Sequence, residues 1–98
     1  MRFTMDKKDK ELTVTVEGRL DTLSSPELEE KLEDEIEGIE KLIFDFNDLE
    51  YISSAGLRVL LTAMQIMDEQ GTMVVRNVRE DVMSVFELTG FADDMNIE

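Results

Sequence analysis

The sequence predicts an α/β fold, in which helices pack on a central, mostly parallel sheet of about four to five strands. Segments with the pattern of strands alternate with segments with the pattern of helices between residues 41 and 88. This alternation is typical of parallel strands joined by right-handed crossovers. The chain has 98 residues, the usual length of one domain, so we expect residues 1–98 to fold as a single unit.

The N-terminal part of the chain predicts two strands. Residues 2–7 are a candidate first strand. Residues 11–17 alternate polar and apolar side chains, as a half-buried strand does. Gly18 breaks this alternation and opens a loop over residues 18–23.

A helix is predicted after this loop. Ser24 can cap it, Glu27 follows three residues later as in a capping box, and Pro26 suits the first helical turn. Its apolar residues form one narrow stripe, which consists of Leu28, Leu32, Ile36 and Ile39. Because most of its other side chains are charged, we expect a surface helix with one face on the sheet.

The apolar run at residues 41–46 predicts a buried central strand, and the polar residues after it open a second loop. We expect Ser53 or Ser54 to cap the next helix, which extends to about residue 69.

A further buried strand is predicted at residues 72–76. Asn77, with Glu80 three residues later, is expected to cap a third helix that ends at Gly90. The tail from residue 91 can add a short last strand or helix.

The composition excludes several classes of function. The chain has no histidine and no cysteine, which removes the commonest general base, the thiol nucleophile and the commonest metal ligands. We therefore expect a binding module with no catalytic residue, metal or cofactor. A net charge of −14 argues against nucleic acid and anionic membranes as partners, since both attract Lys and Arg. The charge keeps a small domain soluble and favours a monomer, although a basic face on a partner is also compatible with it.

No apolar run approaches the length of a membrane helix, and the N-terminus lacks the pattern of a signal peptide. We therefore expect a cytoplasmic protein.

Two loops are candidate functional sites, because ligands of open α/β sheets bind at the carboxyl ends of the strands. They are residues 18–23 and 47–55, and we expect both to open on the same edge. Asp21 could cap a helix, bind a cation or orient a serine hydroxyl across the loops. Asp45, at the end of a strand, is expected to hydrogen-bond to the next loop. A metal held by Asp21, Asp45 and Asp48 has no spacing motif in its favour.

Ser53 and Ser54 are adjacent at the predicted start of a helix. Capping of a free backbone N–H explains one serine. The alternative is a phosphorylation switch, since free N–H groups and the helix dipole stabilise an anion at this place. A phosphoryl group adds nearly two negative charges at neutral pH and would repel a partner that contacts the loop. Gly56, in the first turn, indicates either the close approach of a partner or tight packing against the sheet.

Residues 45–61 read Asp-Phe-Asn-Asp-Leu-Glu-Tyr-Ile-Ser-Ser-Ala-Gly-Leu-Arg-Val-Leu-Leu and closely resemble the signature of STAS domains (sulfate transporter and anti-sigma factor antagonist). The Gly-Arg-Leu-Asp segment at residues 18–21 is similar to the glycine-x-leucine-aspartate turn of the same family. The predicted element order agrees over essentially the whole chain. A lone domain of this length resembles a free-standing bacterial anti-sigma factor antagonist.

The resemblance implies partner switching in transcription regulation. An unphosphorylated antagonist binds an anti-sigma factor, usually a serine kinase with a GHKL-type ATPase fold, and this binding frees the sigma factor. The kinase phosphorylates one serine of the antagonist and so releases itself, and a PP2C-type phosphatase restores binding. Because the kinase holds the ATP, the resemblance implies no cofactor in this chain.

Family members commonly read Asp-Ser-Ser-Gly-Leu or Asp-Ser-Thr-Gly-Leu. Alignment on the Gly-Leu pair places Ser54 at the first hydroxyl position, Ala55 at the second and Ser53 at the aspartate. The resemblance therefore implies phosphorylation at Ser54, with Ser53 as the fallback. The implied partner-binding residues are Asp21, Thr22, Ser53, Ser54, Ala55, Gly56, Leu57 and Arg58.

Two other classes of function are open alternatives. Some STAS proteins support transporter ATPases or build larger signalling assemblies, so this chain could be a constitutive structural subunit. An enzyme would have to use a serine at a helix start with only carboxylates as the base, and we expect none.

Overall fold

The computed structural model describes residues 1–98 and contains a six-stranded sheet with four helices. The strands are β1 (Arg2–Lys8), β2 (Glu11–Leu20), β3 (Lys41–Asp45), β4 (Leu49–Ile52), β5 (Thr72–Arg76) and β6 (Asn96–Ile97). The helices are α1 (Ser25–Glu35), α2 (Ser54–Gln70), α3 (Glu80–Thr89) and α4 (Phe91–Asp94). The main strand order is β1-β2-β3-β5-β6, and β4 pairs with β2 off this path. Since β1 is antiparallel to β2 and all other pairs are parallel, the predicted fold class is confirmed.

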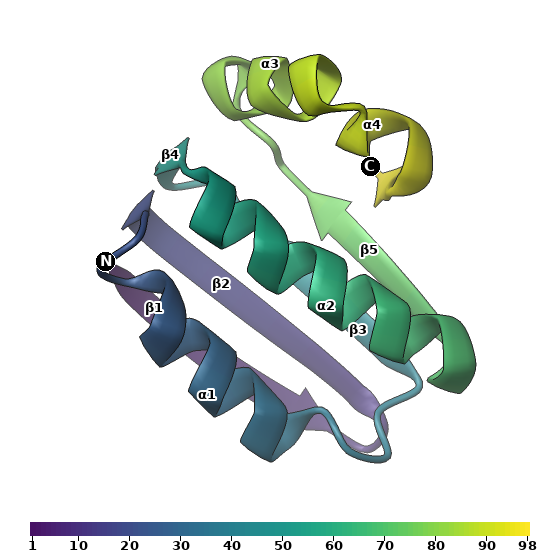
Figure 1. Ribbon diagram of the computed structural model, residues 1–98. Coiled ribbons are helices and arrows are strands. Elements are labelled where there is room, and N and C mark those ends of the chain that lie inside the picture. The colour runs from purple at the N-terminus through teal and green to yellow at the C-terminus, as the bar shows by residue number, and fades with distance from the viewer.

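The hydrophobic core lies between the sheet and the helices. In Figure 1, α1 and α2 lie side by side across one face of the sheet, while α3 lies beyond the end near β4. In β2, the alternate residues Leu12, Val14 and Val16 are fully buried in this core, which confirms the period-two prediction. The predicted stripe of α1 is buried in the same cluster and consists of Leu28 and Leu32, followed by Ile36 and Ile39 just past the helix end.

Strand β4 was not predicted, because the sequence analysis assigned residues 47–55 to a loop. Leu49 and Ile52 are buried while the two residues between them are exposed, so the segment lacks the alternation that indicates a strand. The strand exists because β2 is longer than β3. β2 pairs with β3 over residues 11–15, passes an irregularity at Gly18, which has a φ of +86°, and then pairs with β4. This pairing carries the second loop to the end of β2.

Two predicted helix caps are wrong. The Ser24 side chain makes no capping bond to α1, because its hydroxyl is bonded within the preceding loop. Asn77 has a left-handed φ of +57° and its amide donates to Asp45, so it does not cap α3, which begins three residues later at Glu80. In both cases another bond of the side chain replaced the capping bond that the sequence pattern predicts. For Ser24 it lies within the same loop, and for Asn77 it reaches a distant segment.

The predicted helix end at Gly90 is confirmed, since this residue has a left-handed φ of +83°. The tail forms both elements considered for it, the short helix α4 and the short strand β6 beside β5. No helix of the structure has the length and apolar content needed to cross a membrane.

Candidate functional site

The two candidate loops meet at the carboxyl end of β2. Leu20 is the register partner of Ile52 in β4, and its carbonyl accepts a hydrogen bond from the Ser53 N–H at 2.9 Å. In Figure 1 the ends of β2 and β4 lie near the starts of α1 and α2. The expectation that both loops open on the same edge is confirmed.

Asp21 organises the loop between β2 and α1. Its Oδ1 accepts hydrogen bonds from the backbone N–H groups of Leu23 at 3.1 Å and Ser24 at 3.0 Å, and lies 3.1 Å from the Ser24 hydroxyl. These bonds from Ser24 lower the pKa of the Asp21 carboxyl, with smaller contributions from Leu23 and from the charge of Arg19. The aspartate therefore shapes its own loop, and the serine that it orients is Ser24 rather than one in the second loop.

The Ser24 hydroxyl closes this loop from the other side. It accepts a bond from the Asp21 N–H at 2.9 Å, and its proton can be donated to the Arg19 carbonyl, also at 2.9 Å, or to the Asp21 carboxylate. The loop is thus fixed by four or more bonds among residues close in sequence, which leaves its backbone little freedom.

Ser53 and Ser54 have different roles at the start of α2. Ser53 has an extended backbone, and its Oγ accepts a long hydrogen bond from the Gly56 N–H at 3.5 Å. It is therefore the N-cap, which confirms that one of the two serines caps this helix. Ser54 is the first helical residue, and its exposed hydroxyl makes no hydrogen bond to the protein.

Gly56 explains why the helix can start so close to β2. A Cβ at this position would lie 2.7 Å from Ile52 Cγ1 and 2.9 Å from Leu20 Cγ, with the Leu20 carbonyl at 3.0 Å. Of the two predicted reasons for a glycine here, the structure shows tight packing against the ends of β2 and β4.

The remaining predicted binding residues divide into exposed and buried positions. Thr22 and Arg58 are exposed, Ala55 is half-buried, and Leu57 packs in the core. Arg58 lies four residues after Ser54 and hence on the same helical face, and its guanidinium makes no ion pair within the protein. Only part of the predicted segment can therefore present side chains to a partner.

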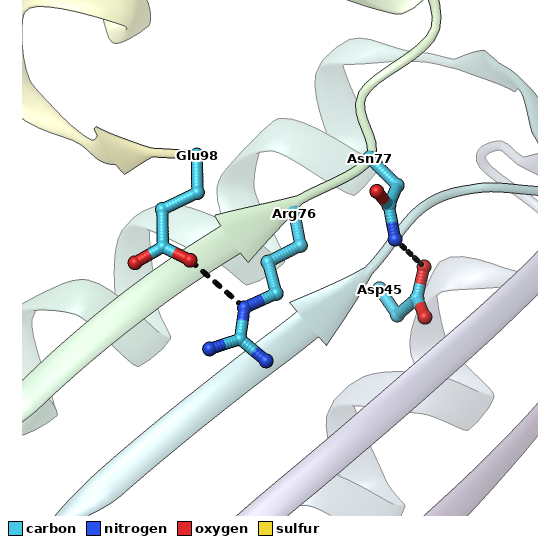
Figure 2. Close-up of polar contacts among 4 residues, drawn as sticks. All are labelled: Asp45, Arg76, Asn77 and Glu98. Carbon is cyan, nitrogen blue, oxygen red and sulfur yellow. Dashed lines mark hydrogen bonds and ion pairs between the residues drawn. The ribbon is translucent and has the colours of Figure 1, made fainter.

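Asp45 has the structural role that was expected for it. Its Oδ1 accepts a bond from the Asn47 N–H at 3.1 Å and one from the Asn77 amide at 3.2 Å, so it joins the loops after β3 and β5. Figure 2 shows this contact beside the ion pair between Arg76 and Glu98, whose Nε and Oε1 are 2.9 Å apart. No three acidic side chains of the chain come close enough together to hold a metal ion.

Sequence reasoning placed three further residues in the two candidate loops but assigned none of them a role. The Arg19 guanidinium lies over the Tyr51 ring at 4.2 Å from its centroid, a cation–π contact between neighbouring strands. Leu23, at the tip of the Asp21 loop, is 91% exposed. The first contact depends on β4, which the sequence did not indicate, but a leucine in a short polar loop was a visible signal.

Comparisons with known proteins agree with this arrangement. The chain is 39% identical over 93 residues to BtrV of Bordetella bronchiseptica, described as an anti-sigma factor antagonist, covering 93% of this chain and 80% of that protein. It is 30% identical over 100 residues to the anti-sigma-B factor antagonist of Bacillus subtilis, covering 99% of this chain and 92% of that protein.

Among solved structures, the fold is similar to that of the Bacillus cell fate determinant SpoIIAA in its phosphorylated form. The TM-score is 0.79 at 19% sequence identity, covering 99% of this chain and 91% of that one. The family model of the STAS domain matches residues 2–98. The chain therefore belongs to the STAS domain family.

Proposed function

We propose that this chain is a cytoplasmic anti-sigma factor antagonist that binds an anti-sigma serine kinase when unphosphorylated and is released by phosphorylation at Ser54. The observation that carries the proposal is the different use of the two serines. Ser53 is half-buried and its oxygen caps α2, whereas Ser54 is exposed with a free hydroxyl. A kinase that approaches this edge has one accessible serine.

The position of Ser54 suits a switch that changes binding and leaves the fold intact. A phosphate on the first residue of α2 would face backbone N–H groups that have no partner within the helix. The helix dipole also favours an anion there. Arg58, one turn further on, is close enough to pair with it.

The charge of the chain supports release by repulsion. The protein already carries a net charge of −14, so a partner that binds it gains from a basic or neutral contact face. Phosphorylation adds about 1.5 to 2 negative charges at pH 7 directly within the contact surface. It also adds hydration that must be removed on binding, so the affinity for the kinase falls.

The relatives supply the class of partner. Two proteins that cover nearly all of this chain are described as anti-sigma factor antagonists, and SpoIIAA, which shares the fold, has been solved with phosphate attached. We infer that the partner is an anti-sigma factor with a GHKL-type kinase fold and that a PP2C-type phosphatase reverses the switch. With no histidine or cysteine, the chain acts as a binding module rather than as an enzyme, and its net charge of −14 favours a monomer.

The test is to incubate the purified chain with ATP and the purified anti-sigma kinase from the same genome, and to map the phosphate by mass spectrometry. We expect one phosphate, on Ser54, in the unchanged chain and in Ser53→Ala, and none in Ser54→Ala. Phosphate on another residue would reject the assignment of Ser54. Stable binding to the kinase without any phosphate transfer would favour a constitutive structural subunit instead.

A further inference from the structure

Few large apolar side chains of this protein are exposed, and most of them lie near one edge. Apart from Met1, they are Leu23 at 91%, Leu88 at 88% and Tyr51 at 40% exposure. Leu23 follows the end of β2, and Tyr51 lies in β4, which pairs with that end. Leu88 lies in a different element, the helix α3.

The loop that carries Leu23 is held rigidly although its tip is exposed. The Leu23 N–H donates a hydrogen bond to the Asp21 carboxylate. The Ser24 hydroxyl accepts a bond from the Asp21 N–H and donates one to the Arg19 carbonyl. Ordering a loop on binding costs free energy, and a loop that is already ordered avoids that cost. An apolar side chain on such a support is arranged for insertion into a pocket of another protein.

Leu23 lies near two residues of types that are common in binding hot spots. Leu23 and Arg19 line the same open hollow at the end of β2, and Arg19 stacks on Tyr51. Tyrosine and arginine are enriched among the residues that dominate protein interfaces. The stacked pair is already ordered before binding, and Arg19 is one of ten cationic residues against 24 acidic ones.

We propose that Leu23 is the apolar anchor by which this antagonist holds its anti-sigma factor, with Arg19 and Tyr51 completing the contact. The inference rests on the proposed function and names a second determinant of the same surface. The anti-sigma factor is the expected partner at Leu23 because this loop is continuous with the surface around Ser54. The Leu23 loop is bonded to the start of α2 through Leu20 and Ser53. The complementary face of the kinase is an apolar pocket for Leu23, with basic groups opposite Asp21 and Glu27, which line the same hollow.

The division of roles is specific. Leu23 supplies affinity through burial of apolar surface, which does not depend on charge. Ser54 supplies control through charge, which depends on ionic strength. The two contributions can therefore be separated in one set of titrations.

The experiment is calorimetric titration of the purified anti-sigma kinase, without ATP, with Leu23→Ala and with the matched control Leu88→Ala. Both substitutions remove an exposed leucine, so both variants should melt at nearly the same temperature as the unchanged chain. We expect Leu23→Ala to raise Kd about tenfold or more, because it removes most of the apolar surface that the leucine buries in the complex. We expect Leu88→Ala to change Kd less than about twofold. The ratio between the Kd of Leu23→Ala and that of the unchanged chain should stay the same between about 0.05 and 0.5 M salt. The increase in Kd caused by Ser54→Asp should shrink over this range.

Equal losses of affinity in the two leucine variants, or no loss of affinity in Leu23→Ala, would show that Leu23 is not the anchor. The proposed phosphorylation switch at Ser54 would be unaffected by that result. Failure of the unchanged chain to bind the kinase would overturn both.

Discussion

The end of the sheet where β3 and β5 begin is tied together by bonds between distant segments, whereas the Asp21 loop at the opposite end is bonded mostly within itself. At the first end, the Gln70 amide donates to the carbonyls of Ile36 at 3.1 Å and Ile39 at 2.9 Å. The Thr72 N–H donates to the Glu40 carbonyl at 3.0 Å, and the Glu40 N–H donates to that of Lys10 at 2.8 Å. This end joins three parts of the chain.

The opposite end keeps its reactive and apolar side chains free. The Asp21 loop satisfies its polar groups internally, and Ser54, Arg58 and Leu23 are left exposed. Bonds such as that between Asn77 and Asp45 join distant segments at this end too, but the side chains that we propose to contact a partner take no part in them. Changes at the first end should reduce stability, and changes at the second should reduce binding.

The largest loss of stability is expected from Gly71→Ala. A Cβ at this position would overlap the backbone of Glu40, which cannot move without breaking the bonds that join the two segments. We expect about 3 kcal/mol lower free energy of unfolding by urea denaturation, with unchanged kinase affinity of the folded protein. Gly56→Ala, which mainly meets the side chains of Ile52 and Leu20, should cost less, about 1–2 kcal/mol. A greater loss of stability from Gly56→Ala than from Gly71→Ala would contradict this difference between the two ends of the sheet.

A smaller loss is expected from Gln70→Ala. The substitution leaves the carbonyls of Ile36 and Ile39 without their donor, at a cost of about 1–2 kcal/mol in urea denaturation. Gln65→Ala is the matched control, because Gln65 is exposed on the same helix and its side chain makes no hydrogen bond to the protein. Similar stabilities of the two variants would show that the bonds of Gln70 do not hold α2 to the end of α1.

The two serines give a matched pair within the site. Ser53→Ala removes the cap of α2 and should lower the free energy of unfolding by about 0.5–1 kcal/mol, the lower part of the range because the bond is long. Ser54→Ala should change it by less than about 0.5 kcal/mol, since it removes an exposed hydroxyl. A greater loss from Ser54→Ala would reverse the roles assigned to the serines.

The smallest effect concerns the pH dependence of the Asp21 loop. The pKa of Asp21 is lowered in the folded protein, chiefly by its bonds from Ser24, so the ionised carboxylate stabilises the fold. This contribution is complete above the unfolded pKa of about 3.9 and is lost as the pH falls through the lower folded value. Denaturation curves of the unchanged chain and Asp21→Asn should therefore differ at pH 6 and converge on acidification. Parallel curves across this range would contradict the role of the charge.

The sequence predicted the fold better than it predicted the ends of its elements. Burial determines the pattern of the three strands that were predicted, at residues 11–17, 41–46 and 72–76. This pattern can be recognised without knowing which residues pack against each strand. The caps assigned to Ser24 and Asn77 failed because those side chains bond to Arg19 and Asp45 instead. The bond of Asn77 exists only after distant segments meet, whereas that of Ser24 depends on how the loop after β2 folds.

The sequence predicted where the two candidate loops lie, but it did not predict every contact within them. The position of the two loops followed from the rule for parallel strands, and their meeting follows from the pairing of β2 with β4. The stacking of Arg19 on Tyr51 could not be predicted without that strand. The motif also could not separate exposed Ser54 from buried Leu57, because the side to which each points is set by how α2 lies on the sheet.

If charge added at Ser54 releases the partner, the phosphorylated and unphosphorylated chains must differ in their affinity for the anti-sigma kinase. The phosphorylated chain is prepared with the kinase and ATP and purified before titration in a calorimeter at low salt. We predict that phosphate on Ser54 raises Kd by at least about tenfold and that the difference narrows as salt increases. Equal affinities of the two forms, with the phosphate located on Ser54, would contradict the account.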